Sequence, residues 1–263
     1  MILEKIAAHT KKRIDDLKSV LSFEDIENIK KQALTLAINK PFAFEKALKT
    51  KDIALICEVK RASPSKGIIS EKFDYLTIAK DYENAGTNAI SVLTEPEFFK
   101  GSDLYLREIK KQVSIPVLRK DFTIDSYQIY EAKIIGADAI LLICALLDTV
   151  KLKEYIKIAD RLGLSALVEA HTEEEIHSAL NAGARMIGVN NRNLHTFEID
   201  MMTSIRLKKL VPDEIVFVSE SGIRTTSDID RLRQNGIDAV LIGETLMRSN
   251  DKKTMLEMLR GKP

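Results

Sequence analysis

Charged and amide side chains stand at the ends of five short apolar runs. Glu58 and Lys60 are two residues apart, so they share one side of an extended strand. The other members of the set, at the ends of four further runs, are Lys120, Glu169, Asn190 and Glu220. A charge at the end of a buried strand is costly unless it is paired or needed. The set predicts acid–base chemistry by lysine and glutamate, with a structural ion pair as the alternative for any one residue.

The apolar runs themselves have the length of buried strands. Eight of them can be counted, near residues 53–59, 89–93, 116–118, 139–143, 166–168, 186–189, 215–218 and 239–242. Stretches with apolar residues at helical spacing lie between them, for example 76–85, 127–135, 152–162, 175–182, 205–210 and 229–234, and a further one lies at 253–259. Strands that alternate with helices predict a parallel sheet.

A recurring glycine marks the junction between helix and strand. It follows a helical stretch and precedes an apolar strand at Gly86, Gly136, Gly183 and Gly236. A glycine in this place supplies the left-handed residue that ends many helices. Helix starts are indicated by Thr172, which precedes three glutamates in a pattern typical of a capping box, and by Thr226 or Ser227.

Eight strand–helix units predict an α/β fold, the (β/α)8 or TIM barrel, which typically needs about 250 residues. The chain has 263. An open doubly wound sheet is the competing topology. Residues 1–48 do not fit the repeat and predict two or three extra helices, which either cover the bottom or side of the barrel or close over a ligand. We expect one domain over 1–263, with a helical extension over 1–48 and the barrel over 49–263.

Composition excludes several classes of protein. Forty basic and 39 acidic residues give a formal net charge of +1, which argues against a nucleic-acid-binding surface. Residues 1–5 lack the apolar core of a signal peptide, and no apolar run approaches the roughly 20 residues that span a bilayer. Cys57 and Cys144 lie in apolar runs, which favours reduced, buried thiols. We expect a cytoplasmic monomer without nucleic-acid or membrane partners.

Two glycines follow the last two predicted strands. Gly222 comes after the seventh strand, and Gly243 comes after the eighth, directly before Glu244 and a short helical stretch. In (β/α)8 enzymes these two loops commonly bind phosphate through backbone N–H groups and a helix N-terminus. The pair predicts a small substrate that carries a phosphate, although a plain turn is the alternative for either glycine alone.

Signals for other chemistries are weak. No metal site is predicted, because metal-ligand spacing is missing among His9, His171, His177 and His195. Gly188 belongs to no nucleotide-binding glycine pattern, and we expect no cofactor. His171 is close enough to Glu169 to touch the pocket, but an ordinary loop histidine is the preferred interpretation. Phe99, in the loop after the second strand, either packs locally or lines an apolar ligand.

The chain resembles the indole-3-glycerol-phosphate synthases, enzymes of tryptophan biosynthesis. The most specific part of the resemblance is EVKRASPSKG at 58–67. It continues in order with SVLTE at 91–95, LRKDF at 118–122, LVE at 167–169, GVNNR at 188–192 and SESGI at 219–223. The resemblance runs over nearly the whole chain, including the N-terminal extension.

This resemblance implies a carboxy-lyase that converts 1-(2-carboxyphenylamino)-1-deoxyribulose 5-phosphate to indole-3-glycerol phosphate, with loss of CO2 and water. It implies that Lys120 is the general acid for ring closure and that Glu169 stabilises positive charge on the anilino nitrogen. It implies that Glu58 and Lys60 serve the dehydration and bind the anionic substrate. The implied substrate-binding residues are Ser63, Asn190, Arg192, Glu220 and Ser221. The residues implied to bind the phosphate are Gly222, Gly243 and Glu244. Those implied to line the wall against the aromatic ring of the substrate are Phe99, Phe122, Leu141 and Leu194.

The sequence departs from the family's usual pattern at two positions. Asn193 stands where an aspartate is common, and Glu244 stands where many relatives have serine. A Glu244 side chain that pointed inward would be awkward beside a phosphate, although backbone N–H groups are expected to make that contact. On the residues alone two other functions stay open: a Schiff-base aldolase with Lys60 or Lys120 as nucleophile, and a non-catalytic sensor of sugar phosphates.

Overall fold

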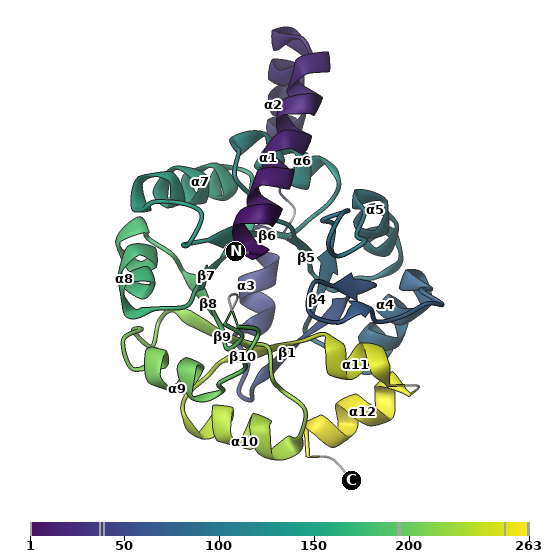
Figure 1. The fold of residues 1–263 in the computed structure, drawn as a ribbon, viewed down its shortest axis with the longest axis vertical. Coiled ribbons are helices and arrows are strands. Elements are labelled where there is room, and N and C mark those ends of the chain that lie inside the picture. The colour runs from purple at the N-terminus through teal and green to yellow at the C-terminus, as the bar shows by residue number, and fades with distance from the viewer. Residues whose placement is uncertain (1, 37, 39, 194–195, 250, 262–263) are drawn as a thin grey trace.

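The computed structural model describes residues 2–36, 38, 40–193, 196–249 and 251–261. Eight parallel strands form a closed barrel in the order β1-β10-β9-β8-β7-β6-β5-β4 (Figure 1). They are β1 (Ala54–Val59), β4 (Ala89–Leu93), β5 (Val117–Lys120), β6 (Ala139–Ile143), β7 (Ser165–Ala170), β8 (Met186–Asn190), β9 (Val216–Glu220) and β10 (Ala239–Ile242). The closed order confirms the predicted barrel, and the open doubly wound alternative is wrong.

Helices follow every strand of the barrel and form a ring around it (Figure 1). They are α4 (Tyr75–Asn84), α5 (Asp103–Gln112), α6 (Ser126–Ile134), α7 (Thr149–Arg161), α8 (Glu173–Ala182), α9 (Met202–Lys208), α10 (Thr226–Gln234), α11 (Glu244–Arg248) and α12 (Lys252–Leu259). The four glycines predicted to end helices all have positive φ. In the described part of the chain, no helix combines the length and apolar character needed to cross a bilayer.

Several strands extend beyond their apolar runs into polar residues. The predicted strand 116–118 runs on to Lys120, 166–168 runs past Glu169 to Ala170, and 215–218 runs on to Glu220. Only backbone groups form the ladder, so a polar side chain at the end does not stop the pairing. Glu169 lies beside Gly188 in the neighbouring strand, and Asn190 lies beside Glu220. The register therefore carries the polar ends of the strands to one rim.

Two layers of apolar side chains hold the barrel together. Those that point outward pack under the ring of helices. Those that point inward, such as Leu118 and Leu167, form a separate inner cluster that also contains Phe44 and Leu48 of α3 (Ala43–Leu48). Helix α3 therefore closes the amino-terminal end of the barrel, and Figure 1 shows it behind the barrel opening.

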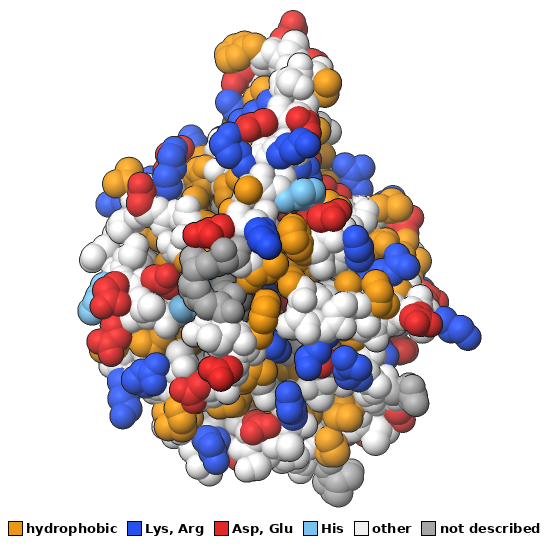
Figure 2. All heavy atoms as spheres, viewed as in Figure 1, with side chains coloured by type: hydrophobic (Ala, Val, Ile, Leu, Met, Phe, Trp, Pro, Cys, Tyr) orange, Lys and Arg blue, Asp and Glu red, His pale blue; other side chains and the backbone are white. Residues whose placement is uncertain are grey.

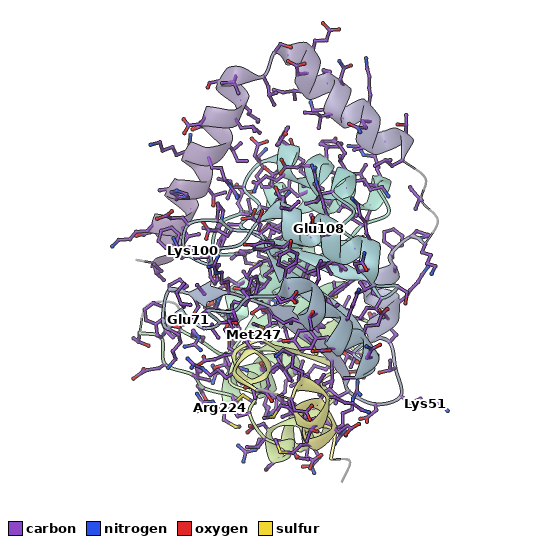
Figure 3. The ribbon with its side chains drawn as sticks, turned by 90° about the vertical axis from the view of Figure 1, so that its right-hand side faces the viewer. Lys51, Glu71, Lys100, Glu108, Arg224 and Met247 are labelled. Carbon is purple, nitrogen blue, oxygen red and sulfur yellow. The ribbon has the colours of Figure 1, made fainter. Side chains whose placement is uncertain are left out.

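The other two helices of the N-terminal extension are α1 (Ile2–Val20) and α2 (Phe23–Thr35). They project beyond the barrel and meet at an angle at their outer ends (Figure 3). Helix α1 lies on the carboxyl-terminal face of the strands. Its Arg13 donates a hydrogen bond to Asp121 at 2.8 Å, and its Lys18 donates one to Asp125 at 2.7 Å. Helix α3 thus covers the bottom of the barrel, as predicted for part of the extension, and α1 lies at the mouth. Closure of the extension over a ligand stays a prediction.

A two-stranded hairpin stands beside the same mouth. Strands β2 (Ala62–Ser63) and β3 (Gly67–Ile68) pair antiparallel across the loop that follows β1. Gly67 has φ +63, a conformation that glycine adopts without strain.

Candidate active site

The loops that follow the strands gather on the side of the molecule where α1 lies. Figure 3 shows Lys100 after β4, Glu71 after β3 and Arg224 after β9 on this side, whereas Lys51, just before β1, lies at the opposite end. A cavity of about 530 Å³ opens here, a volume typical of small-molecule sites. All six polar residues of the predicted strand ends line it: Glu58, Lys60, Lys120, Glu169, Asn190 and Glu220.

Lys120 stands between two carboxylates from other strands. Its Nζ lies 2.9 Å from Oε2 of Glu220 and 3.4 Å from Oε2 of Glu169. Burial acts to lower the pKa of Lys120, but the charges of Glu220, Glu169 and Glu58 outweigh burial and raise it. The ammonium form is therefore the stable one, and Lys120 reaches the cavity as a proton donor rather than as a free amine.

The two carboxylates around Lys120 have different environments. Burial raises the pKa of Glu220 to about 7, because the attraction of Lys120 is offset by the charges of Glu169 and Glu58. Burial acts in the same direction on Glu169, but Lys120, His171 and a hydrogen bond with Asn190 lower its pKa overall. Two neighbouring carboxyl groups with pKa values pushed apart are the usual basis for separate acid and base roles.

Glu58 and Lys60 form a second charged pair in the cavity. Lys60 Nζ lies 2.6 Å from Glu58 Oε2, and the other Glu58 oxygen accepts a long hydrogen bond from Ser91 at 3.5 Å. Gly243 lies directly against this pair, since a Cβ there would be 2.5 Å from Glu58 Oε2 and 2.9 Å from Lys60 Nζ. Gly243 is thus needed for the fit of the Glu58–Lys60 pair as well as lying at the predicted phosphate end.

The missing side chain of Gly188 leaves room for the carboxylate of Glu220. A Cβ on Gly188 would lie 2.4 Å from Glu220 Oε1 and 3.1 Å from Leu167 Cδ1. Glu220 is 2% exposed and packs against the bare backbone of β8. This role of Gly188 was not predicted, because steric room for a side chain distant in sequence leaves no local pattern.

The cavity has an aromatic side. Phe99 and Phe122 face each other with ring centroids 6.1 Å apart, and Leu141 and Ser63 line the same space. The backbone that carries Phe99 is fixed by the buried carboxylate of Glu95, which accepts hydrogen bonds from the N–H groups of residues 97, 98 and 99. Ile2, Leu3 and Ile6 of α1 complete the lining. Leu194, also predicted for this wall, lies outside the described residues.

The opposite end of the cavity is basic. Arg192, Arg224 and Arg248 line it together with Ser221, Gly222, Gly243 and Glu244. Figure 2 shows basic side chains below the centre of this face, over the region of α11. The Glu244 carboxylate lies 3.1 Å from Arg248 and 3.9 Å from Arg192, so it is paired with cations. Arg224 and Arg248 were not predicted, because surface arginines are too common to stand out in a sequence.

The turn at this end is strained. Ser221 has φ +67 and Gly222 has φ +91. A left-handed residue other than glycine costs about 1–2 kcal/mol, and such residues concentrate at functional sites. Within the described residues, no three His, Cys, Asp or Glu side chains are grouped to hold a metal ion.

The family model described as "Indole-3-glycerol phosphate synthase" matches residues 3–259. The chain belongs to this family. Among curated synthases of that name, the one from Ruminiclostridium cellulolyticum is 66% identical over 99% of both chains. The one from Endomicrobium trichonymphae is 56% identical over 99% of this chain and 100% of its own. The resemblance inferred from the motifs is confirmed.

Solved structures of lower identity share the fold. A 3-hexulose-6-phosphate synthase has a TM-score of 0.63 at 13% identity, covering 80% of this chain and 99% of its own. A mutant tryptophan synthase α-subunit from Pyrococcus furiosus has a TM-score of 0.61 at 18% identity, with coverage of 80% and 99%. These two likenesses support the barrel, whereas the indole-3-glycerol phosphate synthase family is established by the full-length relatives.

Proposed function

We propose that the cavity at the barrel mouth carries out the indole-3-glycerol phosphate synthase reaction with Lys120 at its centre. The substrate is 1-(2-carboxyphenylamino)-1-deoxyribulose 5-phosphate, and the steps are ring closure, decarboxylation and dehydration. The observation that carries the assignment is the position of Lys120 Nζ, 3.4 Å from Glu169 and 2.9 Å from Glu220, inside a cavity with one aromatic side and one basic side.

Lys120 acts first, as the general acid of ring closure. It gives a proton to the ketose oxygen while the aromatic carbon attacks, and positive charge then develops on the anilino nitrogen and ring. Glu169 stabilises that charge, since the same neighbours that lower its pKa keep it anionic. Loss of CO2 restores the aromatic ring.

Glu58 and Lys60 then serve the dehydration as a coupled acid–base pair. The 2.6 Å contact between them lets the pair hold one proton for exchange. Removal of water needs a proton on the leaving hydroxyl and a base for the proton that is lost. One member supplies each role.

Substrate orientation follows the polarity of the cavity. The anthranilate ring lies against Phe99, Phe122 and Leu141, and the phosphate lies at Gly222, Gly243 and Glu244, where it meets backbone N–H groups. The arginines of the basic end add charge, so binding of the phosphate displaces part of the pairing with Glu244. The residues left to hold the sugar and the carboxylate are Ser63, Asn190, Arg192, Glu220 and Ser221.

The charge state of Lys120 argues against the Schiff-base aldolase considered above. A Schiff base forms from a neutral amine, and the two carboxylates stabilise the ammonium form. Borohydride reduction in the presence of a ketose phosphate should leave no adduct on Lys120 or Lys60, and a trapped adduct would revive the aldolase.

The decisive experiment is an indole-fluorescence assay on the purified protein. The chain has no tryptophan, so its own fluorescence is low. Lys120→Ala should lower kcat at least about 10²-fold, the usual minimum for a positioned general acid, with a much smaller change in KM. Lys100→Ala is the matched control, because Lys100 is an exposed lysine on the same side of the molecule. Near-normal turnover of Lys120→Ala would remove Lys120 from this role.

A further inference from the structure

His171 lies between two carboxylates that belong to different elements. Its Nε2 is 3.4 Å from Oε1 of Glu169 in β7, and its Nδ1 is 3.2 Å from Oε2 of Glu175 in α8. The backbone N–H of His171 donates to the same Glu175 oxygen at 2.6 Å. The side chain is 18% exposed. The ring is therefore fixed in orientation, with both nitrogens facing negative charge.

This arrangement suits the charged form of the imidazole. The imidazolium carries an N–H at both nitrogens, whereas a neutral ring carries only one. Nδ1 hydrogen-bonds to Glu175, and Nε2 is buried and faces Glu169 at 3.4 Å without a hydrogen-bond partner among the residues that the structure describes, so its contact with Glu169 is electrostatic. Burial acts to lower the pKa of His171, but the hydrogen bond to Glu175 and the charges of Glu169, Glu175 and Glu220 raise it overall. The ring thus presents a positive charge to the side of Glu169 that faces away from Lys120.

Glu220, the other carboxylate around Lys120, has Lys120 at 2.9 Å but no second cation within 4 Å in the described part of the chain. Its Oε1 is buried without a hydrogen-bond partner among the described residues. The other groups around the two carboxylates and His171 come from separate elements. Glu58 and Lys60 come from β1 and its end, Lys120 from β5, Cys144 from the residues after β6, and Asn190 from β8. The cavity beside His171 is also lined by charged side chains of both signs, namely Glu4, Arg192, Glu198, Asp200 and Arg206. Burial raises the pKa of the Cys144 thiol to about 12, so this thiol adds no charge.

We propose that His171 is a positioning residue, which keeps Glu169 ionised and thereby leaves the proton of the carboxylate pair on Glu220. The inference rests on the function proposed above, since it assigns the charge state of groups in that site. His171 does not touch the substrate in this scheme. It acts through Glu169, which must be anionic to stabilise the cationic intermediate.

The pH dependence of kcat/KM tests this role. Loss of a positive charge within about 4–6 Å typically moves a carboxyl pKa by one unit or more. In His171→Gln the acid limb of the profile should therefore move to higher pH by about one unit. At a given pH on that limb, kcat/KM should then be roughly tenfold lower than in the unmodified protein. His177→Gln, which changes an exposed histidine of α8, should leave the profile unchanged. An acid limb of His171→Gln that superimposes on the unmodified protein's would overturn the proposal, whatever happens to kcat.

A second measurement does not depend on activity. In the unmodified protein, NMR of labelled histidines should give His171 a pKa above the ordinary value of 6.5, and Glu169→Gln should lower it. An unchanged His171 titration in Glu169→Gln would refute the coupling. Absence of synthase activity in the unmodified protein would instead refute the proposed function and leave this coupling measurable, so the two failures can be told apart.

Discussion

Replacement of Gly188 by alanine tests how closely the site is fitted to the barrel. Gly188 lies inside β8 and does not have a positive φ, so alanine suits its backbone. The new Cβ would lie 2.4 Å from Glu220 Oε1, whereas ordinary contacts begin near 3.4 Å. Glu220 must therefore retreat by about 1 Å, or β8 must move.

The expected cost follows from that displacement. A misplacement of about 1 Å in an active site can cost about 10²-fold in rate, and the 2.9 Å contact between Glu220 and Lys120 would lengthen beyond hydrogen-bond range. Overpacking a closed core typically destabilises by about 1–3 kcal/mol. We expect Gly188→Ala to fold, to lose about 1–3 kcal/mol of unfolding free energy, and to lose about 10²-fold in kcat/KM.

The assay combines indole fluorescence with denaturant unfolding, and Gly183→Ala is the matched control. Gly183 has φ +87 and nothing within 4 Å of an added Cβ, so alanine there costs about 1–2 kcal/mol of backbone strain without touching the site. Its activity should be retained. In a Glu220→Ala background, Gly188→Ala should cost less stability than it does alone. A folded Gly188→Ala protein with full kcat/KM would refute the steric reasoning.

Two further predictions concern the same cavity. Gly243→Val should raise KM and lower kcat together, because the added side chain strikes Glu58 and Lys60 as well as the phosphate end; steady-state kinetics with an unchanged KM would contradict this. Glu220→Gln should gain thermal stability relative to the unmodified protein between pH 5 and pH 8. Burial raises the pKa of Glu220 from 4.5 to about 7, so its proton stabilises the fold fully below pH 4.5, and this stabilisation is lost as the pH rises through 7. A difference in Tm that is independent of pH would count against it.

Much of the fold could be predicted because it is encoded locally. Each strand is a short apolar run, and Gly86, Gly136, Gly183 and Gly236 mark the helix ends. The errors lie at polar boundaries. Residues such as Glu169 and Glu220 ended the predicted strands early, although the backbone ladder continues through them.

Helix starts show why side-chain geometry is harder to predict. The N-cap of α10 is Thr225, whereas Thr226 or Ser227 was predicted. Thr172 does cap α8, but Glu175 does not complete a capping box, because its carboxylate accepts from the N–H of His171 instead. Chain neighbours alone do not determine which of several nearby donors a carboxylate takes.

The site was predictable where chemistry and strand position coincide. Glu58 and Lys60 share a strand face in the sequence and pair in the structure. Packing of His171 against Glu169 depends on how the loop after β7 turns, so the sequence left an ordinary loop histidine as the preferred interpretation. The steric role of Gly188 depends on the register between β8 and β9, because that register places Glu220 against Gly188. The register is a feature of the folded barrel and has no local signal in the sequence.

The direct pairing of β1 with β10 has a consequence for how the protein is made. Strand β1 is the first strand of the barrel to be synthesised, yet one of its two neighbours, β10, is the last. Until then β1 keeps an unpaired edge, and such edges invite association between nascent chains. Glu58 and Lys60 acquire their final neighbour, Gly243, only when that edge is covered. Closure of the barrel and completion of the surroundings of the Glu58–Lys60 pair are therefore the same event.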